Sequence, residues 1–154
     1  MSCCFLSPRD EEFMSAAIEL AGQAKSDGEV PVGAVIVRDG KIIATGRNRR
    51  EQLGNALAHA ELEAISNACT ALGGWRLDGC ELYVTLEPCP MCAGAIINAR
   101  IDRVIYGASD PKAGSAGSLF DMFELPYNHH PRIKSGIMRE QCADILSDFF
   151  LNLR

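Results

Sequence analysis

The sequence lacks the long apolar segments that membrane proteins need. None of its hydrophobic runs approaches the roughly 20 residues that cross a bilayer as a helix. Its first residues, MSCCFLSPRDEEF, have neither the basic region nor the apolar core of a secretory signal. We therefore expect a cytoplasmic protein with no membrane partner.

The sequence also has fewer positively charged than negatively charged residues. The chain has 15 Lys and Arg against 20 Asp and Glu, a formal net charge of −5. This balance argues against broad, non-specific binding to nucleic acid, which is driven by neutralising phosphates. A local basic patch remains compatible with it. The conspicuous basic cluster is Arg47, Arg49 and Arg50 around Asn48, which is either a solvated loop or such a patch.

Disulfides are not expected either. The seven cysteines are an odd number in a chain without signs of export. Cys69, Cys80 and Cys142 lie among apolar residues and are expected in the core, whereas Cys3 and Cys4 are expected as free thiols before the first helix. Only Cys89 and Cys92 have an informative spacing.

What the chain does have is the composition of one globular domain over residues 1–154, with 1–7 expected to be disordered. Hydrophobic residues make up 47% and charged residues 23%. Ser7-Pro8 and the acids after it begin a first helix, and Asp39-Gly40 predicts a hairpin turn. We expect helices near 8–27, 62–72 and 88–99 and a last helix that includes 142–153, strands near 32–38, 41–47, 81–86, 103–108 and 133–137, and a turn or short helix at 118–123.

This order predicts an α/β fold, a three-layer α/β/α sandwich around one five-stranded mixed sheet. The hairpin supplies an antiparallel pair of strands, and the helical crossovers supply parallel pairs. The expected apolar face of the second long helix is Leu62, Ile65, Cys69 and Leu72. That of the last helix is Cys142, Ile145, Leu146, Phe149 and Leu153.

The Cys-x-x-Cys pair, Cys89 and Cys92, follows Pro88 at the expected start of a helix. Such a pair serves as a redox dithiol, as half of a structural zinc site, or as part of a catalytic metal site. The redox form belongs to a βαβ unit that opens a thioredoxin-like fold, whereas this pair follows a hairpin and two helices. A structural zinc ion needs four protein ligands, typically a second Cys pair or two closely spaced histidines. Besides isolated cysteines, the chain offers only His59, His129 and His130.

His59 and Glu61 stand at the expected start of another helix. Two helix starts that face each other would bring His59, Cys89 and Cys92 around one point, where the helix dipoles favour thiolates. Three protein ligands leave one position of tetrahedral zinc open for water, as in catalytic sites. Side chains two positions apart on a helix point in different directions, so Glu61 is expected to move protons rather than bind the metal.

These residues match the His-x-Glu and Pro-Cys-x-x-Cys signature of the zinc-dependent cytidine and adenosine deaminases. The signature reads His59-Ala60-Glu61 and Pro88-Cys89-Pro90-Met91-Cys92 here. The resemblance covers about Phe13 to Phe150. The segments EVPVGAVIV, LYVTLEPCPMCAGAI, RVIYGASDPKAGSAGSL and CADILSDFF are similar to those of the bacterial tRNA-specific adenosine deaminases, a family that makes inosine at the anticodon wobble position.

The resemblance implies one zinc ion per subunit, held by His59, Cys89 and Cys92, with Glu61 as the catalytic proton carrier. Activated water would attack C6 of adenine, and ammonia would leave. The implied partners are a tRNA anticodon stem-loop and a second copy of the chain in a homodimer. The implied substrate-binding residues are Asn48, Val30, Ala60, Pro88, Asp110, Asn128 and Phe149.

The chain departs from the family pattern at three places. Asn55-Ala56-Leu57-Ala58 precedes His59 where the family has a segment like Asp-Pro-Thr-Ala, and Arg50 stands where a proline is expected. The final residues, LNLR, are almost neutral where the family often has several basic residues. These differences concern tRNA binding and leave every expected ligand in place.

The sequence is therefore compatible with three functions. The leading hypothesis is a wobble adenosine deaminase of tRNA. The second is a deaminase of free guanine or cytosine compounds on the same fold, which the acidic charge favours. The third is a zinc-stabilised RNA-binding subunit without catalysis, against which the presence of Glu61 speaks.

Overall fold

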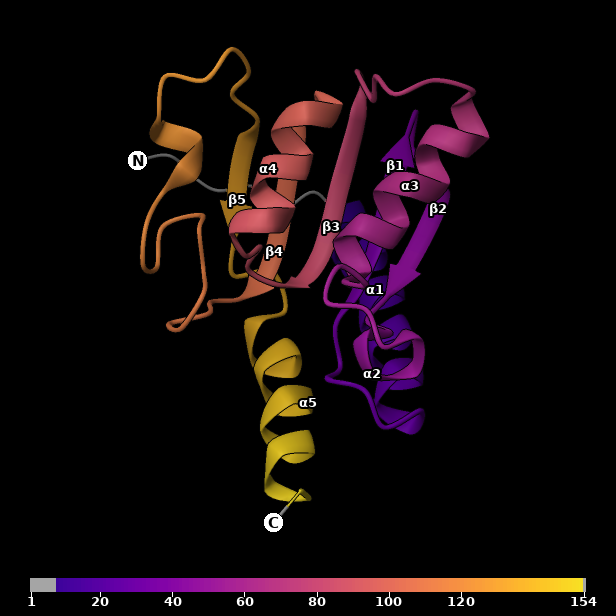
Figure 1. Cartoon of the computed structure of the whole chain (residues 1–154), viewed down its shortest axis with the longest axis vertical. Coiled ribbons are helices and arrows are strands. Elements are labelled where there is room, and N and C mark those ends of the chain that lie inside the picture. Colours follow the sequence, from indigo (N-terminus) through magenta and orange to yellow (C-terminus); the bar gives the residue numbers. More distant parts are fainter. Residues whose placement is uncertain (1–7, 154) are drawn as a thin grey trace.

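The computed structural model describes residues 8–153 as a single five-stranded sheet with helices on both faces (Figure 1). The predictions for residues 1–7, including disorder, the cap at Ser7 and the thiols of Cys3 and Cys4, lie outside the described residues. The elements in chain order are α1 (Pro8–Ser26), β1 (Gly33–Arg38), β2 (Lys41–Arg47), α2 (Arg50–Leu53), α3 (Ala60–Leu72), β3 (Cys80–Leu86), α4 (Pro90–Ala99), β4 (Arg103–Ala108), the 3₁₀ helix η1 (Met122–Glu124), β5 (Arg132–Ser135) and α5 (Arg139–Leu151).

The strands lie in the order β2-β1-β3-β4-β5. β1 is antiparallel to both β2 and β3, whereas β3, β4 and β5 are parallel to one another. The β1–β2 hairpin turns through Asp39 and Gly40, whose φ angles of 51° and 74° fit a two-residue type I′ turn. The predicted mixed sheet is confirmed, and it adds an antiparallel β1–β3 pairing to the pairs expected from the sequence.

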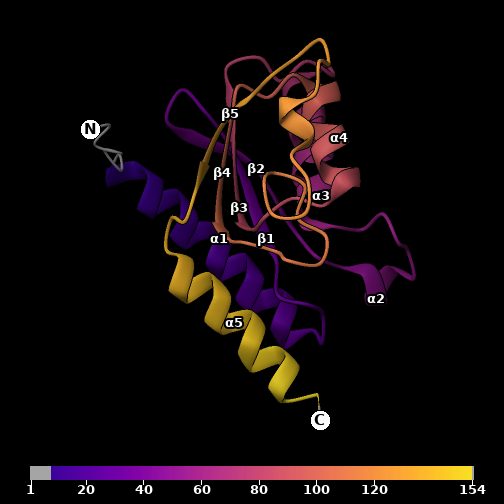
Figure 2. The same ribbon diagram turned by 90° about the vertical axis from the view of Figure 1, so that its left-hand side faces the viewer.

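Each face of the sheet is covered by its own pair of helices. Successive residues of a strand point to opposite faces, so Ile36 and Val84 pack against α3 and α4. Val35 and Tyr83 pack against α1 and α5 on the other face. Figure 2 shows α1 and α5 together on one side of the strands and α3 and α4 on the other. The predicted three-layer α/β/α arrangement is confirmed.

Two glycines allow helices to lie directly on the sheet. A Cβ atom at Gly33 would stand 2.0 Å from the Ala17 carbonyl oxygen of α1. A Cβ at Gly46 would stand 2.2 Å from the Ala60 carbonyl oxygen of α3. Both distances are far inside van der Waals contact, so any side chain at either position would push its helix off the sheet.

The predicted apolar face of α3 is confirmed at Ile65, which is buried, and the close approach at Gly46 explains why the rest of that prediction is wrong. The residues that face the sheet are Ala60, Glu61, Ala64, Ile65 and Ala68, because only small side chains fit above the glycine. Leu72 is 37% exposed, and Leu62 and Cys69 are only half-buried.

Two boundaries also differ from the sequence prediction. The segment 48–57, to which the sequence assigns no helix or strand, contains the short helix α2. Helix α4 begins at Pro90 rather than Pro88, and Cys89 is its N-cap residue. Cys80 and Cys142 are buried in the core as expected.

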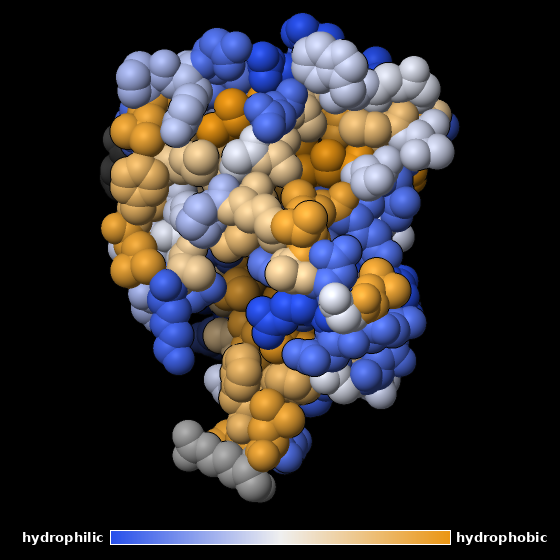
Figure 3. Space-filling view, in the orientation of Figure 1, coloured by the Kyte–Doolittle hydropathy of each residue, from blue (hydrophilic) through white to orange (hydrophobic). Residues whose placement is uncertain are grey.

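Helix α5 extends beyond the strands (Figure 1). Its buried residues are Cys142 and Phe149. The predicted stripe fails at Leu153, which is 66% exposed, because the helix ends at Leu151. Apolar side chains gather over this projecting end in Figure 3. Across residues 8–153, no helix combines the length and the apolar character that crossing a membrane requires.

Asp10, almost completely buried on α1, ties that helix to three strands. It accepts hydrogen bonds from Tyr83 Oη at 2.7 Å, from both Arg103 Nη atoms at 3.0 and 3.1 Å, and from Lys134 Nζ at 3.1 Å. Burial opposes ionisation of Asp10, but these donors outweigh it and lower the pKa of the carboxyl to about 2. The carboxylate therefore stabilises the folded chain at neutral pH.

We expect Asp10→Asn to lower the free energy of unfolding at pH 7 by about 2–4 kcal/mol, since a pKa depressed from 3.8 to about 2 corresponds to roughly 2.4 kcal/mol. The contribution is present above pH 4 and fades as the pH falls toward 2. Urea denaturation at pH 7 and pH 3 measures it, with the exposed Glu12→Gln as the control. An equal deficit of Asp10→Asn at both pH values would contradict this account.

Candidate active site

The candidate site lies where the first residues of α3 and α4 meet beside the end of β3. His59 is the N-cap residue of α3 and Cys89 that of α4, and both have extended backbones. N-cap side chains often accept a hydrogen bond from their own helix, but neither of these two does so. Both side chains therefore remain available to a common ligand.

Three potential metal ligands converge at this point. His59 Nδ1 lies 3.7 Å from Cys89 Sγ and 3.6 Å from Cys92 Sγ, and all three ligand atoms lie within 4.8 Å of one another. Within residues 8–153, no other His, Cys, Asp or Glu joins them as a ligand. His129 and His130 are engaged elsewhere, with the backbone carbonyls of Ile101 and Phe123.

This donor set fits zinc. Two thiolates and an imidazole are ligands that zinc prefers. Tetrahedral bonding with Zn–S near 2.3 Å and Zn–N near 2.0–2.1 Å places sulfur and nitrogen ligands roughly 3.6 Å apart, which is the spacing observed. Three ligands are one fewer than a closed structural site needs, so the set has the composition of a catalytic centre.

The electrostatics of the cluster favour cation binding. Hydrogen bonds from Cys92 and His59, against the effect of burial, lower the pKa of the Cys89 thiol to about 4. The same contact with Cys89, together with burial, raises the pKa of Cys92. The pKa of His59 is raised mainly by its hydrogen bond with Cys89. Cys89 is thus already a thiolate at neutral pH, and a metal would displace the proton of Cys92.

Glu61, the second residue of α3, lies beside the three ligands without being one of them. Its side chain is buried and lines the same cavity. Burial raises the pKa of this carboxyl to about 7. A group with such a pKa exchanges protons in both directions near neutral pH, as a general acid–base requires.

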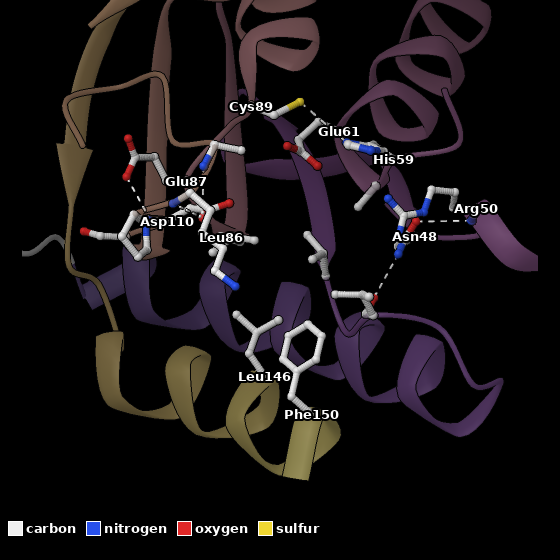
Figure 4. Close-up of a pocket in the computed structure, with 17 residues that line it drawn as sticks. Asn48, Arg50, His59, Glu61, Leu86, Glu87, Cys89, Asp110, Leu146 and Phe150 are labelled. Carbon is white, nitrogen blue, oxygen red and sulfur yellow. Dashed lines mark hydrogen bonds between the residues drawn. The ribbon is translucent and has the colours of Figure 1, made fainter. Parts of the chain in front are cut away.

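A cavity of about 440 Å³ opens in front of Glu61 and the ligands. Asn48 and Arg50 form one wall and the segment 109–113 the opposite wall, with Leu146 and Phe150 of α5 beneath (Figure 4). This volume lies in the range of small-ligand pockets, roughly 300–1,000 Å³. The cavity is therefore large enough for one nucleobase.

Four of the predicted substrate-binding residues line the cavity: Val30, Asn48, Ala60 and Asp110. Asn48 is held on both sides, because its Nδ2 donates to the Val30 carbonyl and its Oδ1 accepts from the Arg50 N–H, each at 3.2 Å. The latter bond needs a residue other than proline at position 50.

The other three lie outside the cavity lining. Pro88 is buried in the turn before Cys89, and Asn128 is exposed on the segment before β5. Phe149 is 9% exposed and packs on the inner side of α5, whereas the next residue, Phe150, is 51% exposed and reaches the cavity. A step of one residue turns a helix by about 100°, so the two side chains leave α5 in different directions, although their rings still meet edge to face with centroids 5.3 Å apart.

Glu87 is a functional candidate that the sequence analysis missed. It is only 2% exposed, and its carboxylate accepts hydrogen bonds from the N–H groups of Asp110, Ala116 and Ser118 at 3.0–3.1 Å and from the Ser118 hydroxyl. Burial opposes its ionisation, yet the Ser118 bond and the backbone donors lower the pKa of Glu87. The Glu87 carboxylate thus holds the segment 109–118, which includes the 109–113 wall, next to the residues that precede Cys89.

Glu29 fastens the opposite wall in the same way. It is 1% exposed, and its two oxygens accept from the N–H groups of Glu51 and Gln52 at 2.9 and 2.8 Å. The residue before α2, Arg49, provides no side-chain cap, so Glu29 supplies it from a distant segment. In the sequence, Glu29 and Glu87 could have been noticed because each is an isolated Glu beside a strongly apolar strand segment.

The comparisons with known proteins agree with this geometry. The family model described as the cytidine and deoxycytidylate deaminase zinc-binding region matches residues 7–108. A tRNA-specific adenosine deaminase of Bacillus subtilis is 50% identical over 147 residues, which cover 95% of this chain and 91% of that protein.

Two solved structures extend the comparison. One, from work on A-to-I editing by tRNA:A34 deaminases, superposes with a TM-score of 0.85 at 49% identity, over 88% of this chain and 99% of that one. A guanine deaminase from Nitrosomonas europaea reaches a TM-score of 0.75 at 27% identity, over 93% of this chain and 84% of that one.

We expect His59→Ala and Cys89→Ser each to weaken zinc binding by at least about 100-fold, because even changes beyond the direct ligands cost 10- to 100-fold. Competition with a chromogenic chelator measures the affinity. Cys69→Ser, a half-buried cysteine outside the cluster, should bind zinc as tightly as the wild type. Equal affinity of Cys89→Ser and Cys69→Ser would refute the ligand assignment.

The two wall carboxylates can be tested against each other. Glu87→Gln should speed amide hydrogen exchange at Asp110, Ala116 and Ser118 by about tenfold, as expected for losing a hydrogen bond worth about 1.4 kcal/mol. Glu29→Gln should do the same at Glu51 and Gln52 only. Uniform acceleration in both variants would indicate general destabilisation instead.

Proposed function

Because the chain belongs to the cytidine and deoxycytidylate deaminase family, we propose that it hydrolyses adenosine to inosine at the wobble position of a tRNA anticodon. The observation that carries this proposal is the match, over almost the whole length of both chains, to a structure of a tRNA:A34 deaminase. The guanine deaminase shares the fold at much lower identity.

His59, Cys89 and Cys92 would hold one zinc ion. Bound there, zinc supplies Lewis-acid chemistry that makes water a usable nucleophile near neutral pH. The protein itself holds the three donors together. His59 and Cys89 can take part because neither side chain is used to cap its own helix.

Glu61 would carry the protons of the reaction. Deamination replaces the amino group at C6 of adenine by an oxygen from water and releases ammonia, so a proton must leave the water and another must reach the departing nitrogen. A buried carboxyl with a pKa of about 7 can accept the first and donate the second through its Oε atoms. One residue thereby serves as base and then as acid.

The cavity would receive the adenine after it has left the anticodon stack. Extruding an unpaired loop base costs only a few kcal/mol, and the pocket offers Val30 and Ala60 as apolar contacts with Asn48 as the polar one. Asp110 lies at the rim, where a neighbouring nucleotide can reach it. Asn128, Phe149 and Pro88 remain proposed contacts that would act from outside this cavity.

A deaminase of free guanine or cytosine compounds is the second candidate, favoured by the shared fold with the guanine deaminase. Ammonia release from free bases and nucleosides, measured beside inosine formation in a stem-loop RNA, separates the two. A purely RNA-binding subunit would have no need for the buried carboxyl of Glu61 next to the ligands.

We further propose a cytoplasmic homodimer. The apolar segment 93–97 gives little support to a dimer, since Ile96 and Ile97 are buried in their own chain. Better support comes from Leu119, Phe120 and Tyr127, large apolar side chains that are 44–64% exposed on the connection from β4 to β5. Sedimentation of the pure protein tests this assembly.

Glu61→Gln should lower kcat for inosine formation in an anticodon stem-loop by at least about 100-fold, the usual contribution of a general acid–base. Zinc content and folding should be unchanged. The exposed Glu19→Gln on α1 serves as the charge-matched control. If Glu61→Gln turned over at nearly the wild-type rate, the proton-carrier role would have to be abandoned.

A further inference from the structure

Two cationic side chains stand on opposite walls of the cavity. Arg50 belongs to the α2 wall and Lys112 to the 109–113 wall, and both line the opening. Both are exposed, and neither makes a hydrogen bond or ion pair through its side chain within residues 8–153. In an acidic protein with a net charge of −5, unpaired cations on both sides of one pocket require an explanation.

The neighbouring arginines show that this is not a property of the whole basic cluster. Arg47 pairs with Asp27 at 3.1 Å and donates to Gln23 at 2.6 Å. Arg49 forms a 2.7 Å ion pair with Glu63. The structure therefore divides the basic cluster of Arg47, Arg49 and Arg50: Arg47 and Arg49 bind other side chains of the protein, whereas the side chain of Arg50 has no such bond in the described part of the chain.

The backbones that carry the two cations are fixed. The Arg50 N–H is bonded to Asn48 Oδ1, and the next two residues are bonded to Glu29. The Lys112 N–H donates to Asp110 Oδ1 at 3.0 Å, and Asp110 is bonded to Glu87. Only the side chains would be ordered on binding, which limits the entropic cost.

An extruded nucleotide has a phosphate on each side of it, and phosphates are the groups that exposed Arg and Lys bind most often in nucleic acids. We propose that Arg50 and Lys112 form a two-sided phosphate clamp, each contacting one backbone phosphate next to the nucleotide whose base enters the cavity. The clamp rests on the proposed function in that its ligand is a single-stranded RNA segment; a free base has no such phosphates.

The test is the salt dependence of RNA binding. An end-labelled anticodon stem-loop with wobble adenosine is titrated with the zinc-loaded protein by fluorescence anisotropy between 50 and 200 mM KCl. Every protein carries Glu61→Gln, so the RNA is not consumed. The variants are Arg50→Gln, Lys112→Gln and both together.

Each single variant should reduce the slope of log affinity against log salt by about 0.7, the contribution of one phosphate contact on a single strand, and the double variant by about 1.4. Between 50 and 200 mM KCl, the loss of affinity should then be roughly 2.6-fold smaller in each single variant, and about sevenfold smaller in the double variant, than in the parent protein. Binding at 50 mM KCl should be weaker in all three.

Lys41→Gln and Arg132→Gln are matched controls. Both residues are exposed, and they begin β2 and β5 at the end of the sheet away from the cavity. Their slopes should equal that of the parent. Equal slope changes in the controls would show that the positive charge of the whole surface, and not a phosphate clamp, attracts the RNA. Unchanged slopes in the Arg50 and Lys112 variants would also overturn the proposal.

The outcome is separable from that of the proposed function, because inosine formation is measured independently with the wild-type protein. If the wild type made no inosine but the slopes shifted as expected, the deaminase assignment would fail and the phosphate clamp would stand. If inosine formed and the slopes did not move, the clamp alone would be wrong.

Discussion

The arrangement of the site depends on how closely α3 lies on β2. Gly46 has no side chain to hold the helix away, and Ala60 and Ala64 above it are small enough to keep the backbones in contact. This contact fixes the distance between the sheet and the start of α3, and therefore the position of His59, the residue before Ala60. The segment after β3 brings Cys89 Sγ to within 3.7 Å of His59 Nδ1, so the metal-binding set depends on both placements together.

Much of the fold follows from local chemistry that the sequence displays. The alternation of residues such as Val35 and Ile36, the Asp39-Gly40 turn and the signature around His59 and Cys89 each depend on neighbours in the chain, and each was predictable. The buried face of α3 was predictable only at Ile65, since the alanines that lie on the sheet depend on a glycine of β2, Gly46. Nor was α2, whose first turn is capped by Glu29 from a distant segment.

The same division holds within the site. The residue types of the metal set can be predicted because zinc demands them, but the cavity lining depends on rotations that only packing decides. Phe149 and Phe150 are chemically identical neighbours, and the burial of Phe149 in the core selects which of them faces the cavity. Within residues 8–153, Arg47 and Arg49 form ion pairs with Asp27 and Glu63 and Arg50 forms none, a difference that composition cannot show.

Glu29 and Glu87 fasten both cavity walls through backbone N–H groups almost exclusively. A main-chain N–H is present in every residue except proline, so this fastening does not depend on which side chains the walls carry. Residues of the walls can therefore change during evolution while the walls keep their positions over the metal. The architecture separates what must stay constant for the chemistry from what may vary for recognition, and a new nucleic-acid partner can be acquired without rebuilding the catalytic centre.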